Sequence, residues 1–399
     1  MNDFKRNSRI YVFVFGLIFL YLTLLSFPIT AQPTVKVVEL SETINLSLPF
    51  RLCYQKQDNK IASVNFASDN TGSLFVAFQA GNVAKMNLTS NAAIWMSNLG
   101  GEIVSDLIFE DGSVFLITKI FEATSEKDKI SDGGKQITNY ILWSLDAETG
   151  LTIWQLPFIS NDSVFLDSYR DKLFLITKDG TVNSIKKSDA HEISNTNLAR
   201  NISSLPDFFE NKIYIGTEDN SILTISVDNA EIVSKIPTLQ SPASILIAAR
   251  DKLFWGERKG FVNLFDTKSN SRVWSVRYGG EISSLTLVPD GILVASLDNF
   301  IYLISPQKGK KVWKRRLAGR ISAKPLVVDN FAVFVTAVDN SAVVLDLRNG
   351  KIVNQISLAD IGFILSRPVI AGKSLVFLTN KGIFAFSGAN AGCYSTLKR

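Results

Sequence analysis

A repeat of about 40 residues is the feature that most constrains how this chain can fold. Its clearest copy is Gly291–Trp313, where two short alternating apolar runs flank the pair Asp298-Asn299. Alternation with a period of two indicates a half-buried strand, and Asp-Asn favours a tight turn because both residues tolerate left-handed backbone angles. A second turn at Pro306–Gly309 leads into a third run that carries Trp313. Each copy therefore predicts an antiparallel meander.

The position of Trp313 can be followed through most of the sequence. Successive equivalents lie 59, 40, 40, 40, 39 and 41 residues apart, and the turns before the second and third strands keep the same step. A period near 40 with about four short strands per unit is the signature of a β-propeller. The equivalent positions are Trp95, Trp154, Ser194, Ser234, Trp274, Trp313 and Asn354.

Eight units can be counted, and the last one ends after its third strand, Gly382–Ser387. The alternating segment Thr34–Leu48 is the expected donor of the missing outer strand, because closing the ring removes exposed edges. The sequence thus predicts an all-β fold: one eight-bladed β-propeller of four-stranded antiparallel blades, residues 32–392, closed by an N-terminal strand and followed by a tail, 393–399. The units open near Lys60, Gly101, Asn161, Asn201, Gln240, Gly280, Gly319 and Asp360.

The 59-residue spacing marks an insertion in the second blade. Residues 121–139 are polar and charged and contain Gly133-Gly134, which is typical of a protruding loop. Such a loop either carries function on a rigid scaffold or is a tolerated insertion.

Residues 1–31 have the composition of an export signal. Lys5, Arg6 and Arg9 precede an apolar run of 18 residues, and a small residue, Ala31, stands before a polar start. This pattern favours a signal peptide cleaved near Ala31. The run is also at the length needed to span a bilayer, so an uncleaved anchor is the alternative. Either way the body is expected outside the cytoplasm.

Composition excludes several classes of site. The chain has one histidine, His191, and two cysteines, which leaves little material for histidine-based acid–base chemistry, Ser-His-Asp triads or zinc sites. A net charge of +5 is too mild to indicate nucleic-acid binding. No catalytic, cofactor-binding or metal-binding residue is predicted.

The tryptophans are predicted to be structural. A large aromatic residue late in each repeat can lie flat against the neighbouring blade and bury on the order of 150–250 Å². Trp143 and Trp255 fall inside strands and are expected in the core. The residues assigned to interblade packing are Trp95, Trp154, Trp274 and Trp313.

Two stretches, SLDAETGLTIWQL (144–156) and LDLRNGKIVNQI (345–356), resemble the PQQ-type propeller repeat, whose core reads roughly Ala-Leu-Asp-x-x-x-Gly-x-x-x-Trp. The resemblance covers residues 60–390 and implies the propeller fold. It does not decide between quinone-dependent dehydrogenases and cofactor-free scaffolds, both of which use the repeat.

Among the scaffolds, the chain is most similar to the BamB-type proteins of the outer-membrane β-barrel assembly machinery. Length, leader, blade number and the final unit, 362–387, agree with them. The resemblance implies a non-enzymatic protein-binding scaffold, periplasmic or associated with the outer membrane, with that machinery and its substrates as partners. Strand addition to an outer blade edge would suit such a role.

One departure concerns the lipid anchor. BamB-type proteins carry a cysteine directly after the leader, whereas Cys53 lies far downstream, beside Arg51. The anchor is therefore not carried over, and membrane association is expected through partners or an uncleaved leader.

The enzyme alternative is a quinone-dependent periplasmic dehydrogenase. That group uses adjacent cysteines over the quinone, whereas the two cysteines here are 340 positions apart. We therefore expect no enzyme activity and no cofactor. A small-ligand-binding propeller remains a third possibility.

One run of positive charge surrounds Trp313. It indicates either a contact with acidic lipid headgroups or an acidic partner, or a solvated outer strand whose charges deter sheet-to-sheet association. The run comprises Lys308, Lys310, Lys311, Lys314, Arg315, Arg316 and Arg320.

The two cysteines are predicted to form a disulfide. If an N-terminal strand completes the eighth blade, Cys53 and Cys393 belong to neighbouring segments of one sheet. An exported protein is in a compartment where disulfides persist. The alternative is two unrelated buried thiols.

Overall fold

The computed structural model describes residues 44, 46, 47, 49–58, 60–62, 66–69, 71–88, 90, 92–120, 138–249, 251–321, 324–337 and 340–388, with the side chains of 244–249 excepted. The leader, the tail and most of the insertion therefore lie outside the described residues. Among the described residues, no helix has the length and hydropathy needed to cross a membrane.

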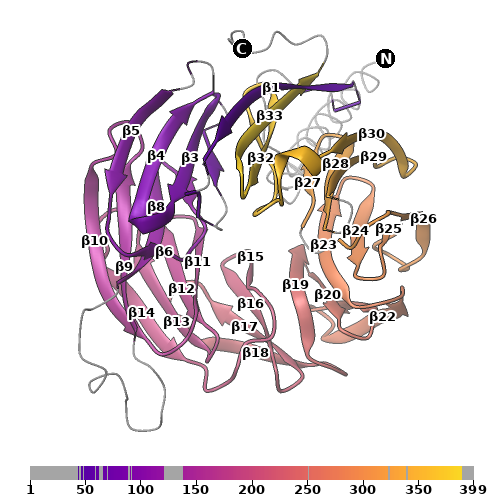
Figure 1. The fold of residues 1–399 in the computed structure, drawn as a ribbon. Helices are drawn as coiled ribbons and strands as arrows, with labels where there is room; N and C mark the ends of the chain where they lie inside the picture. The colour runs from indigo at the N-terminus through magenta and orange to yellow at the C-terminus, as the bar shows by residue number, and fades with distance from the viewer. Residues whose placement is uncertain are drawn as a thin grey trace, which may run out of the picture. The chain divides into compact units, whose positions relative to one another are not determined.

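The described chain forms eight antiparallel sheets arranged as the blades of a propeller (Figure 1). Each blade runs from an innermost strand to an outermost one, as the sequence predicts.

The first four blades follow one another along the chain. Blade 1 contains β2 (Ala67–Ser68), β3 (Ser73–Phe78), β4 (Asn82–Asn87) and β5 (Ala92–Asn98), with the 3-10 turn η1 (Gln79–Gly81) between β3 and β4. Blade 2 contains β6 (Glu102–Ile103), β7 (Ile108–Glu110), β8 (Ser113–Ile120), β9 (Thr138–Asp146) and β10 (Thr152–Ser160). Blade 3 contains β11 (Val164–Tyr169), β12 (Lys172–Thr177), β13 (Thr181–Lys186) and β14 (Glu192–Asn197). Blade 4 contains β15 (Asp207–Phe209), β16 (Lys212–Thr217), β17 (Ser221–Ser226) and β18 (Ile232–Pro237).

The remaining blades complete the ring. Blade 5 contains β19 (Pro242–Ala249), β20 (Lys252–Glu257), β21 (Phe261–Asp266) and β22 (Ser271–Arg277). Blade 6 contains β23 (Ile282–Val288), β24 (Gly291–Ser296), β25 (Phe300–Ile304) and β26 (Lys311–Arg316). Blade 7 contains β27 (Leu326–Val328), β28 (Phe331–Thr336), β29 (Ser341–Asp346) and β30 (Lys351–Ser357). Blade 8 contains β31 (Val369–Ala371), β32 (Ser374–Thr379), β33 (Gly382–Gly388) and β1 (Phe50–Gln57), and the 3-10 turn η3 (Ala359–Ile361) precedes it.

The turn residues adopt the left-handed backbone angles that their side-chain types predict. Asn220, Asn299 and Asn340 have φ values of 60°, 70° and 46° between the second and third strands of their blades. This left-handed region is open to asparagine at small cost, which is why the turn can be tight. The sequence signal for each hairpin is therefore local.

The hydrophobic core lies between blades. The second and third strands of each blade are buried on both faces; every residue of β3, β24, β29 and β32 is buried. Outer strands such as β26 alternate between exposed and half-buried positions. Packing of successive blades therefore stabilises the ring, and each blade depends on both neighbours.

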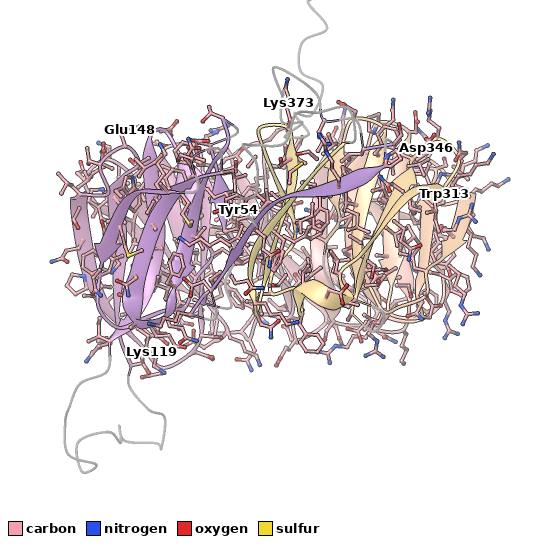
Figure 2. All side chains as sticks on the ribbon, turned by 45° about the horizontal axis from the view of Figure 1, so that its top comes forward. Tyr54, Lys119, Glu148, Trp313, Asp346 and Lys373 are labelled. Atoms are coloured by element: carbon pink, nitrogen blue, oxygen red, sulfur yellow. The ribbon has the colours of Figure 1, made fainter. Side chains whose placement is uncertain are left out.

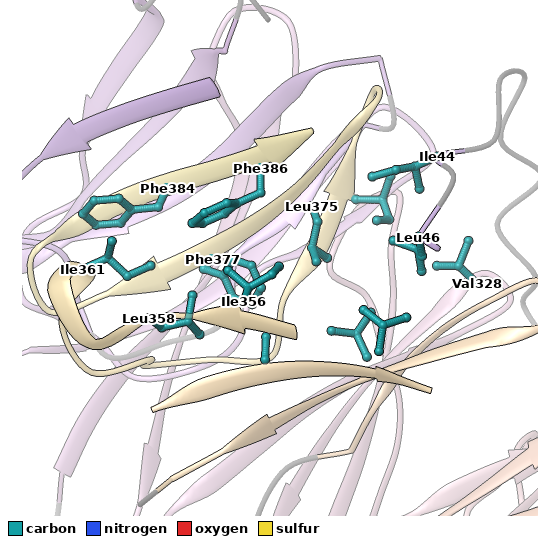
Figure 3. Packing of buried hydrophobic residues seen from close by; sticks show 14 residues of the cluster. Ile44, Leu46, Val328, Ile356, Leu358, Ile361, Leu375, Phe377, Phe384 and Phe386 are labelled. Carbon is teal, nitrogen blue, oxygen red and sulfur yellow. The ribbon is translucent and has the colours of Figure 1, made fainter. Parts of the chain in front are cut away.

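The ring closes with an N-terminal strand, but not with the segment that alternation favours. β1 pairs with β33 from Phe50 opposite Gly388 to Gln57 opposite Gly382, so residues 50–57 supply the outer strand and the expectation of Thr34–Leu48 is wrong. Ile44 and Leu46 are buried instead among side chains of blades 7 and 8 (Figure 3). Their apolar character serves this packing, whereas β1 has the mixed polarity of an outer strand.

Candidate interaction surfaces

The four predicted interblade tryptophans lie on outer strands and reach the next blade. The indole nitrogen of Trp313 donates a hydrogen bond to the carbonyl oxygen of Leu347 at 2.7 Å. The other three make the same contact with the turn between the last two strands of the following blade. These bonds are Trp95 to Ala147 at 3.0 Å, Trp154 to Lys187 at 2.8 Å and Trp274 to Pro306 at 3.0 Å.

Glycines in those turns allow the rings to approach. A Cβ on Gly350 would lie 2.6 Å from the ring of Trp313, and one on Gly150 would lie 2.5 Å from the ring of Trp95. Both glycines also have positive φ, 67° and 73°. The Gly and the Trp of the repeat are therefore partners across adjacent blades, and that contact explains why they recur together.

The eighth blade uses Tyr54 at the tryptophan position, which sequence reasoning missed. Tyr54 pairs with Ala385 just after a bulge in β1, as Trp313 pairs with Leu303 just after a bulge in β26. It is buried against blade 1, its hydroxyl has no hydrogen-bond partner among the residues that the structure describes, and burial raises its pKa to about 12. Figure 2 shows Tyr54 on the strand that closes the ring.

Asparagine takes the position in blade 7. The side-chain amide of Asn354 donates to the carbonyl oxygen of Leu46 at 3.4 Å, so it also reaches the segment that leads into blade 8. Trp143 and Trp255 are buried within their own blades, where their indole nitrogens donate to Thr118 and Glu257.

All eight outer strands carry a bulge at the residue before this position. Ile94, Val233 and Val312 are examples of the bulged residue, and each is at least half exposed. A bulge twists the free edge and interrupts its row of backbone groups, which protects an edge strand from pairing with another sheet. The bulges therefore disfavour strand addition at the outer rim.

The propeller has two faces that differ in their loops. The hairpin face contains the turns between first and second and between third and fourth strands, including Glu148, Asp346 and Lys373 (Figure 2). The connection face contains the turns between second and third strands, together with the blade-to-blade connections hydrogen-bonded to them. Lys119 marks the connection face at the end of β8, where the predicted insertion begins. Residues 121–137 of that insertion lie outside the described part of the chain.

The connection face carries three of the most exposed large apolar side chains. Ile159 lies next to the last residue of β10, Leu239 lies between blades 4 and 5, and Phe363 lies between blades 7 and 8; they are 68%, 68% and 69% exposed. Phe363 has a fixed backbone: its amide donates to Asn380 Oδ1 at 2.7 Å, and its carbonyl accepts from the Asn380 amide at 3.0 Å. A rigid loop thus presents an aromatic ring to solvent.

The predicted basic run forms what we call the blade-6 basic stripe: Lys308, Lys310, Lys311, Lys314, Arg315, Arg316 and Arg320. It starts on the hairpin face, follows β26 and ends on the connection face. Lys314 Nζ lies 3.6 Å from the ring centroid of Phe300, and Arg315 Nε donates to the carbonyl oxygen of Gly350 at 2.6 Å. Arg315 is half-buried and the other six are exposed.

Charged side chains from four blades influence one another near the start of β27. Lys324, just before that strand, is an exposed residue, but desolvation of its ammonium group by the surrounding chain lowers its pKa; Asp207 of β15 and Asp167 of β11 oppose that shift, and Arg367 adds to it. No group of three or more potential metal ligands lies together among the residues that the structure covers.

Cys53 is buried in β1, at the bulge next to Tyr54. Cys393 lies outside the described residues, so the disulfide between them stays a prediction.

Comparisons with known proteins agree with this architecture. The family model for outer membrane protein assembly factor BamB matches residues 55–276 and 258–383. BamB from Moraxella catarrhalis is similar in structure, with a TM-score of 0.63 and 15% sequence identity, covering 84% of this chain and 99% of that one. The computationally designed Ika8 protein has a TM-score of 0.68 at 12% identity, with the same coverage. No curated protein matches the sequence. Because the family match extends over most of the chain, the protein belongs to the family of outer membrane protein assembly factor BamB.

Proposed function

We propose that the protein is a non-enzymatic, protein-binding scaffold of the cell envelope that assists the assembly of outer-membrane β-barrel proteins. The observation that carries the proposal is the family match from residue 55 to residue 383 on a closed eight-bladed ring. A propeller is a stiff platform whose loops are held in place by the sheets, and binding loops on rigid scaffolds are a common arrangement. Membrane association through partners, or through an uncleaved leader, is part of the proposal.

We assign partner binding to the connection face. Interfaces depend on a few aromatic or apolar anchors held in a fixed conformation, since a preorganised side chain loses little entropy on binding. Phe363 meets that description, because Asn380 fixes its backbone while 69% of the residue is exposed. Ile159 and Leu239 add apolar surface on the same face. The bulged outer edges are the weaker candidate for holding a partner strand.

The function is tested by deleting the gene and measuring outer-membrane β-barrel protein levels and envelope permeability. We expect lower levels and higher permeability, both restored by the wild-type chain. Unchanged levels and permeability would remove the assembly role.

The surface is tested by complementing the deletion with Phe363→Asp and with Leu151→Asp. The two residues are equally exposed, 69% each, but Leu151 lies on the hairpin face. We expect F363D to fail and L151D to restore function, with both variants folded by circular dichroism. Full complementation by F363D would show that the partner binds elsewhere, while leaving the assembly role in place.

A further inference from the structure

The cations of the blade-6 basic stripe have no acidic partners in the described part of the chain. None of the seven takes part in an ion pair within the described residues. Several lysines of blades 1–4 differ, since Lys172, Lys187 and Lys235 pair with carboxylates. The stripe is therefore a run of seven cations along one strand that the described acidic groups do not neutralise.

The sequence around the stripe extends this imbalance to half of the ring. Residues 60–241, which include blades 1–4, contain 14 Lys and Arg against 23 Asp and Glu. Residues 242–358, which include blades 5–7, contain 17 against 9. The modest net charge of the whole chain thus hides an acidic half and a basic half. The electrostatic field of an anionic surface orients a molecule with this charge distribution so that its basic half faces the surface.

Protection of the outer edge does not account for the stripe. Lysines on edge strands can deter sheet-to-sheet association, but every outer strand here is already bulged. The outer strands β5, β10 and β14 contain no lysine or arginine at all. Seven cations around one strand therefore exceed what an edge in this fold requires.

The geometry fits a flat anionic surface better than a protein partner. The stripe follows a whole strand on the outer rim, a length of about 20 Å at roughly 3.3 Å per residue. Four of its seven cations are lysines, a residue type depleted from protein–protein interfaces but typical of segments that bind anionic lipid. The bulge at Val312 also hinders a partner strand from pairing with β26. Val312, 56% exposed among these cations, offers a small apolar contact at the same surface.

We propose that the blade-6 basic stripe docks the propeller on a bilayer that contains anionic phospholipids. This role is additional to the proposed protein-binding function and uses mainly a different surface, the outer rim of blade 6, which meets the connection face only at Arg320. Lys308, Lys310 and Lys311 reach the phosphates, while Lys314 and Arg315 are held by Phe300 and Gly350.

The test is co-sedimentation of the purified chain with vesicles of phosphatidylcholine alone or mixed equally with phosphatidylglycerol. We expect binding to the mixed vesicles only, and loss of binding when salt rises from about 0.1 M to about 1 M, because the screening length falls from about 10 Å to about 3 Å. Equal binding to both vesicle types, or binding to neither, would overturn the proposal.

A matched pair of variants separates the stripe from net charge. Lys308→Glu with Lys310→Glu should weaken binding by at least about 30-fold, since each lost cation near an anionic bilayer removes roughly a fivefold factor and each new carboxylate adds repulsion. Lys60→Glu with Lys178→Glu makes the same change in net charge at exposed positions of blades 1 and 3, and should leave binding within about twofold. Equal weakening by both pairs refutes a localised site. Retention on polyglutamate beads without vesicle binding would assign the stripe to an acidic protein instead.

Discussion

At the scale of single residues, Glu257 breaks a rule of the repeat. The last buried position of the second strand is threonine in five blades: Thr118, Thr177, Thr217, Thr336 and Thr379. Glu257 is 2% exposed and accepts hydrogen bonds at Oε1 from Trp255 Nε1 at 3.1 Å and from Asn263 Nδ2 at 3.0 Å. Burial raises its pKa, and the two neutral donors offset only part of that effect. The fold therefore favours the protonated carboxyl more than the unfolded chain does.

This gives the free energy of unfolding a pH dependence of known sign. Below the ordinary glutamate pKa of 4.5 both states are protonated; as pH rises above it, the unfolded chain ionises more readily, so the wild type loses stability until the folded-state pKa is passed. We expect Glu257→Gln to remove this loss, so that E257Q gains stability relative to wild type between acidic and neutral pH. Thermal unfolding of both proteins across that pH range measures the difference. Parallel pH curves for the two proteins would contradict it.

At the scale of elements, the contact between outer strand and next turn sets the packing of adjacent blades. A turn glycine can be required by its backbone conformation, by close packing against the neighbouring blade, or by both. Gly350, between β29 and β30, and Gly112, between β7 and β8, can be compared because both have positive φ, 67° and 73°. A Cβ at Gly112 meets nothing within 4 Å, whereas one at Gly350 would overlap the ring of Trp313. Gly112 is therefore required only by its backbone conformation, whereas Gly350 is also required by the packing of Trp313 against blade 7.

We expect Gly112→Ala to cost about 1 kcal/mol, from the left-handed backbone. Gly350→Ala should cost about 2–4 kcal/mol, because displacement of the tryptophan adds to the same backbone penalty. Chemical denaturation of the two variants provides the comparison. Equal losses would mean that the ring moves aside freely and that the Gly–Trp contact is not a constraint.

The sequence predicts the blades well because their signals are local. The turn residues and the 40-residue step place each hairpin without knowledge of its neighbours. The same periodicity could have identified Tyr54, because it lies 41 residues before Trp95. Tyr54 was missed because it is not a tryptophan and because the apolar alternation of Thr34–Leu48 favoured that segment as the outer strand. Phe363 could not be found this way: its fixed backbone depends on Asn380, in a turn of the following blade. Surfaces depend on contacts between units, which periodicity does not describe.

At the scale of the whole molecule, the first and last described strands, β1 and β33, meet in one blade. β1 and β33 pair along their full lengths, and Cys53 lies in that seam. A bridge to Cys393 would constrain a loop of some 340 residues, for which the chain-entropy model gives about 4–5 kcal/mol.

We therefore expect no reactive thiol when the unfolded, non-reduced protein is titrated, and two after reduction. Reduction should also lower the midpoint of thermal unfolding, because the seam joins segments from opposite ends of the chain. Two reactive thiols before reduction would show that the cysteines are independent.

The shared blade also sets an order of events during synthesis. β1 (Phe50–Gln57) is synthesised well before β33 (Gly382–Gly388), with all the other strands between them, yet Phe50 must pair with Gly388. Blades 1–7 are each built from contiguous residues and can form as they emerge, whereas β1 has to wait with its edge unpaired. A message cut short before the codon for Gly382 would yield seven blades, the incomplete pair of β31 and β32, and a strand β1 without its partner β33. Synthesis of β33 is thus the step that allows the array of blades to close into a ring. A product that ends before β33 exposes an unpaired strand edge that a protease or chaperone can bind.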